Sequence, residues 1–393
     1  MTALPPPPVS APVPPPAAPP QPGLPPVAPL ASPAPLLAAP PQPGLPLASP
    51  APPPSALPVV FRAYHEYYRT PRLRWWKPLV ALAVLCAASL GAMLLLLIPY
   101  ALVAPALGEA FDDAAELPAT PLAFLYMNLS LAAIVPAAIV AHRLVFGQRA
   151  GWLASIQGRF RWRLLGRFLL TALPFYLAWY GTVILVEGAD FSELRVDERT
   201  VPVILIILLT TPLQCAGEEY ALRGLVPRCV GAWFPHRVVG FVVATVVSSV
   251  VFMLLHGVSD PWMNLGYLCF AVAGSVLVWR TGGLEAAIAL HVVNNMIAMV
   301  TVPFEDLAVA LGEPGPGSPW LLLEIPVLVA TGAAFWWQAK RLGLPTQAAP
   351  GAVERPGDET IAAEGTGTRG DATGRRRIHY DGYGCCDDAQ HDG

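Results

Sequence analysis

The stretch VPVILIILLTTPLQCAGEEYALRG, residues 201–224, places two glutamates and an arginine in a run that is otherwise apolar and long enough to cross a membrane. A transmembrane helix needs about 20 mostly apolar residues. An ionisable side chain at mid-membrane costs about 2.5–3.5 kcal/mol or more. Glu218, Glu219 and Arg223 are therefore expected to face the interior of a helical bundle and to have a function there.

The rest of the chain repeats this pattern of long apolar runs. Only 13% of the 393 residues are charged and 54% are hydrophobic, whereas soluble domains carry about 25% charged residues. The runs predict an all-α, polytopic membrane helical bundle of about eight transmembrane helices. The predicted spans are 78–104, 120–141, 164–186, 201–222, 238–257, 263–279, 285–303 and 319–338.

Two polar or proline-rich tails flank the predicted membrane domain, which covers residues 61–342. Residues 1–60 contain many prolines and no charged residue, which is typical of a disordered tail rich in polyproline II. This tail is either a spacer or a ligand for a partner domain. Residues 343–393 are rich in Gly, Asp and Arg and are expected to be a disordered polar tail.

The connections between the spans alternate in charge. Basic residues flank one set of span ends: Arg62, Arg69, Arg72, Arg74, Lys77, Arg143, Arg149, Arg159, Arg161, Arg163, Arg223, Arg228, Arg237, Arg280, Lys340 and Arg341. The other connections are mainly acidic: Glu109, Asp112, Asp113, Glu116, Glu187, Asp190, Glu193, Asp197, Glu198, Glu305, Asp306 and Glu313. The positive-inside rule predicts a multi-pass protein of the cell (inner) membrane with both termini in the cytoplasm.

Three polar clusters within the apolar runs have the residue types that hydrolysis of a peptide bond requires. Glu219 and Arg223 are four residues apart in the order that favours an ion pair on a helix, which leaves Glu218 free to act as a general base. His256, at the end of the fifth span, is placed to share a water with Glu218. His291 and Asn295 are also four residues apart and are donors suited to an oxyanion.

Each of these clusters also has a structural interpretation. A lone histidine in a membrane helix often only packs, the pair of Glu219 and Arg223 can simply stabilise the fold, and Asn295 can join two helices. Simple hairpins also place Glu218 toward the inner side and His256 near the outer end of its span. A fourth helix that continues to about residue 230, with a tilted fifth helix, would bring the two side chains together.

A zinc site is the alternative to a metal-free site. Glu218, His256 and His291 have the chemistry of zinc ligands and would leave a fourth position open. No His-Glu-x-x-His motif is present, and His65-Glu66 begins one without its second histidine. We therefore expect no required cofactor, with zinc possible at those three residues. The net charge of −3 argues against a nucleic-acid partner.

The motifs Glu-Glu-x-x-x-Arg-Gly at 218–224, Phe-x-x-x-His at 252–256 and His-x-x-x-Asn at 291–295 resemble the CAAX prenyl endopeptidase and bacteriocin-processing (CPBP) family of intramembrane proteases. The resemblance covers about residues 160–303. It implies that Glu218 and His256 activate water, that His291 and Asn295 stabilise the oxyanion, and that Glu219 and Arg223 support the site. For this family, both a metal-dependent and a glutamate-dependent, metal-free mechanism have been proposed.

The resemblance also implies a membrane-embedded endopeptidase with a cytoplasm-accessible site. Its substrate would be a membrane-associated or lipidated protein or peptide, reached among membrane lipids. Two other interpretations remain: a non-catalytic immunity or scaffold protein that keeps this fold, and a transporter that uses the same acids and imidazoles as a proton relay. The spans show no convincing inverted repeat, which counts against the transporter.

Overall fold

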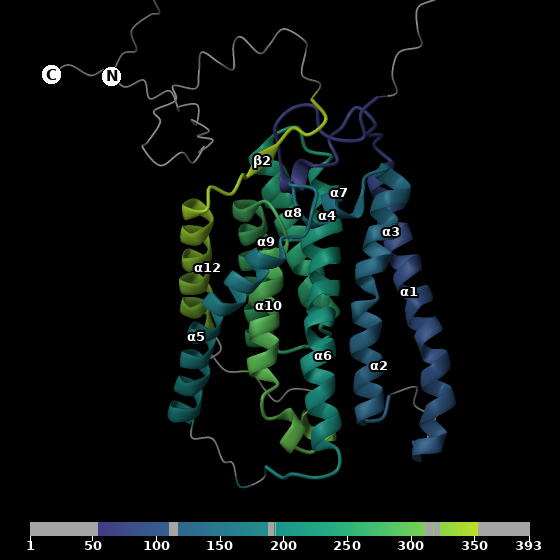
Figure 1. The fold of residues 1–393 in the computed structure, drawn as a ribbon, viewed down its shortest axis with the longest axis vertical. Helices are drawn as coiled ribbons and strands as arrows, with labels where there is room; N and C mark the ends of the chain where they lie inside the picture. The colour runs from purple at the N-terminus through teal and green to yellow at the C-terminus, as the bar shows by residue number, and fades with distance from the viewer. Residues whose placement is uncertain are drawn as a thin grey trace, which may run out of the picture. The chain divides into compact units, whose positions relative to one another are not determined.

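The computed structural model describes residues 54–109, 117–187, 192, 194–310, 317 and 323–352. The predicted disordered tails therefore lie mostly outside the described residues. Within these ranges the molecule is a bundle of helices (Figure 1). The main helices are α1 (Lys77–Val103), α2 (Pro121–Ala132), α3 (Ile134–Phe146), α5 (Trp162–Glu187), α6 (Thr200–Glu219), α7 (Val226–Gly231), α8 (Arg237–Leu255), α9 (Pro261–Thr281), α10 (Glu285–Ala298) and α12 (Glu324–Arg341).

Shorter elements connect these helices or cover their ends. They are the 3-10 helices η1 (Tyr64–Glu66), η2 (Ala104–Leu107) and η4 (Val302–Phe304), the π-helix η3 (Tyr220–Leu225), α4 (Ala150–Ala154) and α11 (Leu307–Ala310). Two short strands, β1 (Arg62–Ala63) and β2 (Gln347–Ala348), pair antiparallel. The predicted all-α bundle is confirmed.

Seven helical segments in the described residues are long and apolar enough to cross a membrane. They are Lys77–Leu107, Pro121–Phe146, Trp162–Val186, Thr200–Gly231, Arg237–Leu255, Pro261–Thr281 and Glu285–Phe304. Each overlaps one of the first seven predicted spans. The eighth predicted span, 319–338, is described only from residue 323 onward. Its helix, α12, has three charged residues among 18, Glu324, Lys340 and Arg341, and is not among the seven segments.

The fourth span is longer than the predicted 201–222 and agrees with the alternative in which this helix continues to about residue 230. Helices α6 and α7 and the π-helix η3 between them form one helical segment of 32 residues, Thr200–Gly231. The predicted end at residue 222 is therefore wrong, because the chain passes through Arg223 and Gly224 without leaving the helix. This extension places Glu218 well inside the span, as the depth of the polar cluster requires.

The middle of the bundle is built around α6 and α10. Helix α6 packs against α2, α3 and α10, and α10 also contacts α5 and α9. Gly217 allows one close approach, since a Cβ at this position would overlap the carbonyl oxygen of Leu131 in α2. The helices that carry the glutamate pair and the motif His-x-x-x-Asn are therefore fixed in the core.

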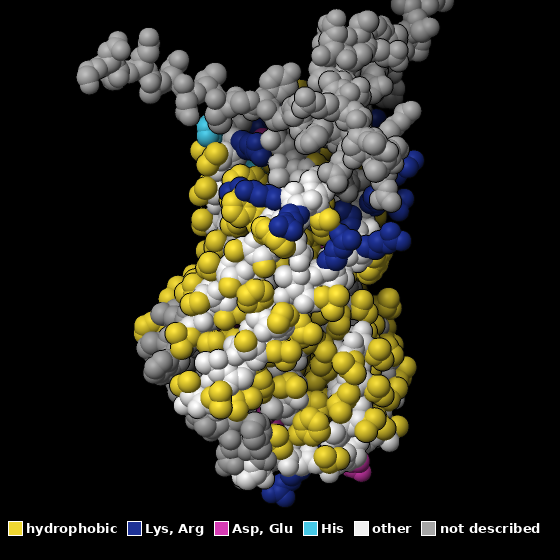
Figure 2. Space-filling view, turned by 60° about the vertical axis from the view of Figure 1, so that its left-hand side comes forward, with side chains coloured by type: hydrophobic (Ala, Val, Ile, Leu, Met, Phe, Trp, Pro, Cys, Tyr) yellow, Lys and Arg dark blue, Asp and Glu magenta, His cyan; other side chains and the backbone are white. Residues whose placement is uncertain are grey.

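The outer surface of the bundle is apolar along most of its length. Large hydrophobic side chains such as Leu95, Leu170 and Leu209 are more than half exposed on α1, α5 and α6. Figure 2 shows hydrophobic side chains over much of one face, with Lys and Arg mainly toward one end. This distribution fits helices whose outer sides contact lipid and whose polar residues face inward.

One end of the bundle is closed by a group of aromatic side chains around a buried arginine, which we call the cap. Tyr64, Tyr67 and Tyr68 are buried there, and Arg228 lies 3.8 Å from the ring centroid of Tyr64. The hydroxyl of Tyr64 donates to the carbonyl oxygen of Leu153, 2.5 Å away. Burial raises the pKa of Tyr64 to about 12.

Candidate active site

Glu219 and Arg223 form an ion pair in the interior of the bundle. Glu219 Oε1 lies 3.0 Å from Arg223 Nη1, and both side chains are almost fully buried. The Arg223 guanidinium also lies 4.1 Å from the centroid of the Phe252 ring. Gly274 leaves room for it, since a Cβ there would be 3.3 Å from Arg223 Nε. The i, i+4 partner expected from the sequence is present.

A change in helix type accompanies this cluster. The helix is α-helical up to Glu219 and becomes the π-helix η3 from Tyr220 to Leu225. Single π-turns inside α-helices are uncommon and are frequent at functional sites. The wider turn begins directly after the two glutamates and includes Arg223, so the cluster lies at the one point in the segment where the helical geometry changes.

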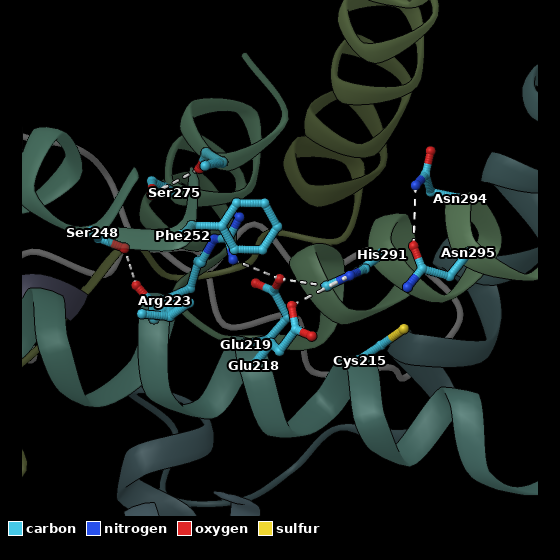
Figure 3. A network of polar contacts seen from close by, with 12 residues as sticks. Cys215, Glu218, Glu219, Arg223, Ser248, Phe252, Ser275, His291, Asn294 and Asn295 are labelled. Carbon is cyan, nitrogen blue, oxygen red and sulfur yellow. Dashed lines mark hydrogen bonds and ion pairs between the residues drawn. The ribbon is translucent and has the colours of Figure 1, made fainter. Parts of the chain in front are cut away.

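His291 on α10 connects the two glutamates. Its Nδ1 atom lies 2.8 Å from Glu219 Oε1, and its Nε2 atom lies 3.8 Å from Glu218 Oε2. Figure 3 shows both carboxylates on one helix, pointing toward the imidazole of the other. Because an ionised carboxylate only accepts hydrogen bonds, Nδ1 must carry a proton when Glu219 is paired with Arg223. Nε2 then accepts in the neutral ring and donates only in the imidazolium.

Gln214 joins the glutamate motif to the asparagines of α10. Its Nε2 donates to Glu218 Oε1, and its Oε1 accepts a hydrogen bond from Asn295 Nδ2 at 3.4 Å. Asn294 Nδ2 in turn donates to Asn295 Oδ1 at 3.2 Å. Gln214 was not among the predicted site residues, although its position four residues before Glu218 places the two on one helix face. The amide thus orients both the predicted base and the predicted oxyanion donor.

A cavity of about 120 Å³ adjoins this network. It is lined by Phe252, His256, Met263, Gly266, Tyr267, Phe270, His291, Asn294, Asn295 and Glu324. Glu324, at the start of α12, also lies in the cavity wall. Nothing in the spacing of the motifs connects it to them, since α12 joins the cavity only through the tertiary fold.

His256 lies in the cavity wall and is oriented by its neighbours. It follows the last residue of α8, its Nδ1 atom is 2.8 Å from the carbonyl oxygen of Phe252, and its ring stacks on Tyr267 with centroids 4.0 Å apart. In the described part of the chain, no hydrogen bond or ion pair joins it to Glu218. The structure therefore gathers Glu218, Glu219, Arg223, His291 and Asn295 into one network and places His256 beside it.

The three candidate zinc ligands are not arranged as a metal site. Among the described residues, no three His, Cys, Asp or Glu side chains are grouped closely enough to hold a metal ion. Glu218 is bonded by Gln214, whereas the bond from His291 Nδ1 to Glu219 leaves Nε2 facing Glu218 and does not by itself exclude a metal. As placed, Glu218, His256 and His291 do not fit a zinc ion.

A comparison with family models supports the resemblance. Residues 200–297 match the Rce1-like family model, described as type II CAAX prenyl endopeptidase Rce1-like. No curated protein and no solved structure matches the chain. The matched region contains all three motifs and the helices that bring them together. Over residues 200–297 the chain is therefore similar to this family of prenyl endopeptidases, which supports the resemblance to the CPBP family.

Proposed function

We propose that this protein is an intramembrane endopeptidase of the CAAX type, which hydrolyses a peptide bond in a membrane-associated or lipidated polypeptide. The observation that carries the proposal is the chain of contacts from Arg223 through Glu219 and His291 to Glu218. A structural ion pair needs only the first two residues. The additional imidazole and the second carboxylate beside a cavity are what water activation requires.

Glu218 is the proposed general base. Gln214 holds Oε1, and Oε2 faces His291 Nε2 at 3.8 Å, too far for a direct hydrogen bond but close enough for one water to contact both atoms. In the first step, the water oxygen attacks the scissile carbonyl carbon and its proton passes to Glu218. The carbonyl π electrons move to oxygen and form the oxyanion.

His291 and Asn295 are the proposed oxyanion donors. His291 Nδ1 is bonded to Glu219, so His291 can donate to the oxyanion only from Nε2, and only as the imidazolium. The carboxylates of Glu218 and Glu219 flank this imidazolium. Asn295 uses one Nδ2 hydrogen for Gln214 and has a second. In the second step, the oxyanion collapses, the C–N bond breaks, and Glu218 returns its proton to the leaving amine.

His256 is assigned a role at the cavity wall beside Glu218. Its Nδ1 atom is engaged by the backbone of Phe252, so Nε2 is the nitrogen available to a water or substrate. We propose that it helps to position the attacking water, as the resemblance implies. A His256→Ala variant should then lower activity while the Glu219–Arg223 pair and the fold remain intact.

Substrate trapping with Glu218→Gln tests the function. The variant should keep the shape of the site and retain uncleaved substrate, which mass spectrometry of the purified complex identifies. The captured polypeptide is then incubated with the unsubstituted enzyme, which should cut it at one bond. Capture of the same polypeptide by both proteins, without cleavage by either, would instead indicate a non-catalytic scaffold.

A further inference from the structure

A long apolar groove lies on the outside of the bundle between α9 and α12. Its volume is about 550 Å³, and among the described residues that line it Arg280 is the one that is charged. Helix α12 packs on α9 and α5 at the outer edge of the bundle (Figure 1), so the groove is on the surface that contacts lipid. Val272 and Val329 in its walls are exposed. Because unfilled apolar space forfeits dispersion contacts, a hydrocarbon chain suits this groove.

The groove is about as long as one leaflet of a membrane is thick. Its lining on α9 extends from Leu268 to Arg280, which corresponds to about 18 Å of helix. Its lining on α12 extends from Ile325 to Trp336, which corresponds to about 17 Å. The hydrocarbon core of a bilayer is about 30 Å thick, so each leaflet provides about 15 Å. The groove therefore fits one acyl chain that lies along the two helices.

Two cations lie at one end of the groove, where α9 and α12 both end. We call this the basic end, since Figure 2 shows Lys and Arg mainly there. Arg280 Cζ lies 5.4 Å from the centroid of the Trp336 ring, and Lys340 Nζ lies 3.9 Å from it. Both cations are exposed, and no carboxylate in the described part of the chain is within ion-pair distance of either. Like charges against one ring repel each other, and an anion bound to both would offset this repulsion.

We propose that this groove binds an anionic phospholipid, with one acyl chain between α9 and α12 and the phosphate held by Arg280 and Lys340. The positive-inside rule places the basic end in the cytoplasm, so the lipid belongs to the cytoplasmic leaflet. Basic pockets between transmembrane helices on that side suit anionic headgroups. Tryptophan is typical of the headgroup level, where Trp336 lies beside both cations. The proposal is independent of the peptidase function.

The opposite end of the groove borders the cavity of the candidate site. Leu268 and Ile325 in the groove directly follow Tyr267 and Glu324 in the cavity wall. An acyl chain in the groove would pack against both helices along the length over which they leave space between them. Bound lipid is therefore expected to hold α12 in place and to stabilise the folded protein.

Lipid titration of the purified, delipidated protein in detergent tests the proposal. One series uses dioleoyl phosphatidylglycerol, and the other uses dioleoyl phosphatidylcholine, which has the same chains and a zwitterionic headgroup. Native mass spectrometry measures the affinity for the first bound lipid, and thermal unfolding measures the stabilisation that binding confers. Phosphatidylglycerol should bind more tightly and raise the melting temperature more. Equal affinity for the two lipids would overturn the proposed headgroup site.

The double variant Arg280→Gln with Lys340→Gln tests the two cations. Each cation beside an anionic headgroup contributes about 5-fold to affinity, so phosphatidylglycerol should bind roughly 25-fold more weakly. Binding of phosphatidylcholine should change little. The matched pair Arg74→Gln with Arg143→Gln removes two exposed cations before α1 and on α3, away from the groove, and should bind normally. Equal losses in both pairs would show a general charge effect and overturn the proposal.

Gly332→Trp tests the groove itself. A Cβ at this position meets no heavy atom within 4 Å, so the indole can fill the groove without moving the backbone. The variant should lose the stabilisation by phosphatidylglycerol. Gly91→Trp, at an equally open position on α1, is the matched control and should keep it. Unchanged binding by Gly332→Trp would overturn the proposal, and Ala333→Trp repeats the test if that variant does not fold.

The same spectra identify two other occupants. A dimer that Gly332→Trp disrupts, without preference for phosphatidylglycerol, would assign the groove to a second copy of the chain. A lipidated peptide that displaces phosphatidylglycerol and binds more tightly would assign the groove to a substrate. Either result would overturn the phospholipid site and leave the proposed peptidase function intact, whereas an inactive protein that binds phosphatidylglycerol as expected would contradict only the function.

Discussion

Two arginines on one helical segment, Arg223 at the site and Arg228 at the cap, are both fully buried and have different partners. Arg223 is paired with the carboxylate of Glu219, which also binds His291. Arg228 lies over the ring of Tyr64 and donates from Nη1 to the carbonyl oxygen of Trp152 at 2.5 Å. No carboxylate in the described residues is within ion-pair distance of Arg228.

This difference shows which buried charge is part of a larger network. In the cap, Arg228 contacts aromatic rings and one carbonyl oxygen, and these contacts do not connect it to a second ionisable group of the site. At the site, Arg223 is paired with Glu219. Glu219 also binds His291, and His291 faces Glu218. The first arrangement is expected to stabilise the fold, whereas the second is expected to control proton positions as well.

The largest expected effect is the loss of activity in Glu218→Gln. Glutamine keeps the size of the side chain and removes the base, so activity should fall by about 10²–10⁴, the usual contribution of a general base. The amount of folded protein in the membrane should stay close to that of the unsubstituted chain. Cleavage assays on equal amounts of folded protein measure this, and full activity would remove Glu218 from the proposed chemistry.

Glu219→Gln should act mainly on folding. It leaves Arg223 buried without its carboxylate, and breaking a buried pair costs about 3–5 kcal/mol. Thermal unfolding in detergent should show the loss. The double variant Glu219→Gln with Arg223→Met, which removes both charges, should recover part of the stability. If Glu219→Gln stays folded and inactive while Glu218→Gln is active, the two glutamates have exchanged roles.

Gln214→Ala probes the amide that orients the site. A hydrogen bond to a charged group contributes about 1.5–3 kcal/mol, so removing the bond to Glu218 should lower kcat by about 10–100-fold. Stability should change much less than in Glu219→Gln. Gln214→Glu is a useful second variant, because it puts like charges beside each other and should be worse than alanine. Equal activity for all three proteins would show that Gln214 does not orient the base.

Arg228→Met tests the other member of the comparison. No carboxylate is left unpaired, so the expected loss of stability is only about 1–2 kcal/mol, from the cation–π contact and one hydrogen bond. Activity per folded molecule should be unchanged. The matched variant Arg223→Met should be clearly less stable, since it leaves the buried Glu219 carboxylate without its guanidinium and bonded only to His291. Similar losses in both variants would mean that the pairing of Arg223 makes no difference.

Chelation should have the smallest effect. We propose a site that requires no metal, so exhaustive treatment of the purified protein with a chelator should leave both cleavage and thermal stability unchanged. Activity that is lost on chelation and restored by stoichiometric zinc would overturn this. It would then make Glu218, His256 and His291 the candidate ligands, and would require the three side chains to come closer together than they are here.

The sequence was sufficient to predict the class of fold and to single out most of the residues that the structure joins in one polar network. Apolar runs of about 20 residues predict membrane helices directly, because lipid requires every backbone group to be satisfied within the helix. The spacing of Glu219 and Arg223 predicts their pairing, because residues four apart share a helix face. The same argument, applied one turn earlier, would have found Gln214.

Only the tertiary structure decided how these residues are combined. The bond from His291 to Glu219 rather than to Glu218 depends on how α10 packs against α6, and the place of Glu324 in the cavity depends on α12. Neither can be read from spacing, because contacts between helices far apart in the sequence depend on packing and not on helical periodicity. The π-helix at Tyr220–Leu225 was not predicted either, since no residue within it signals a wider helical turn.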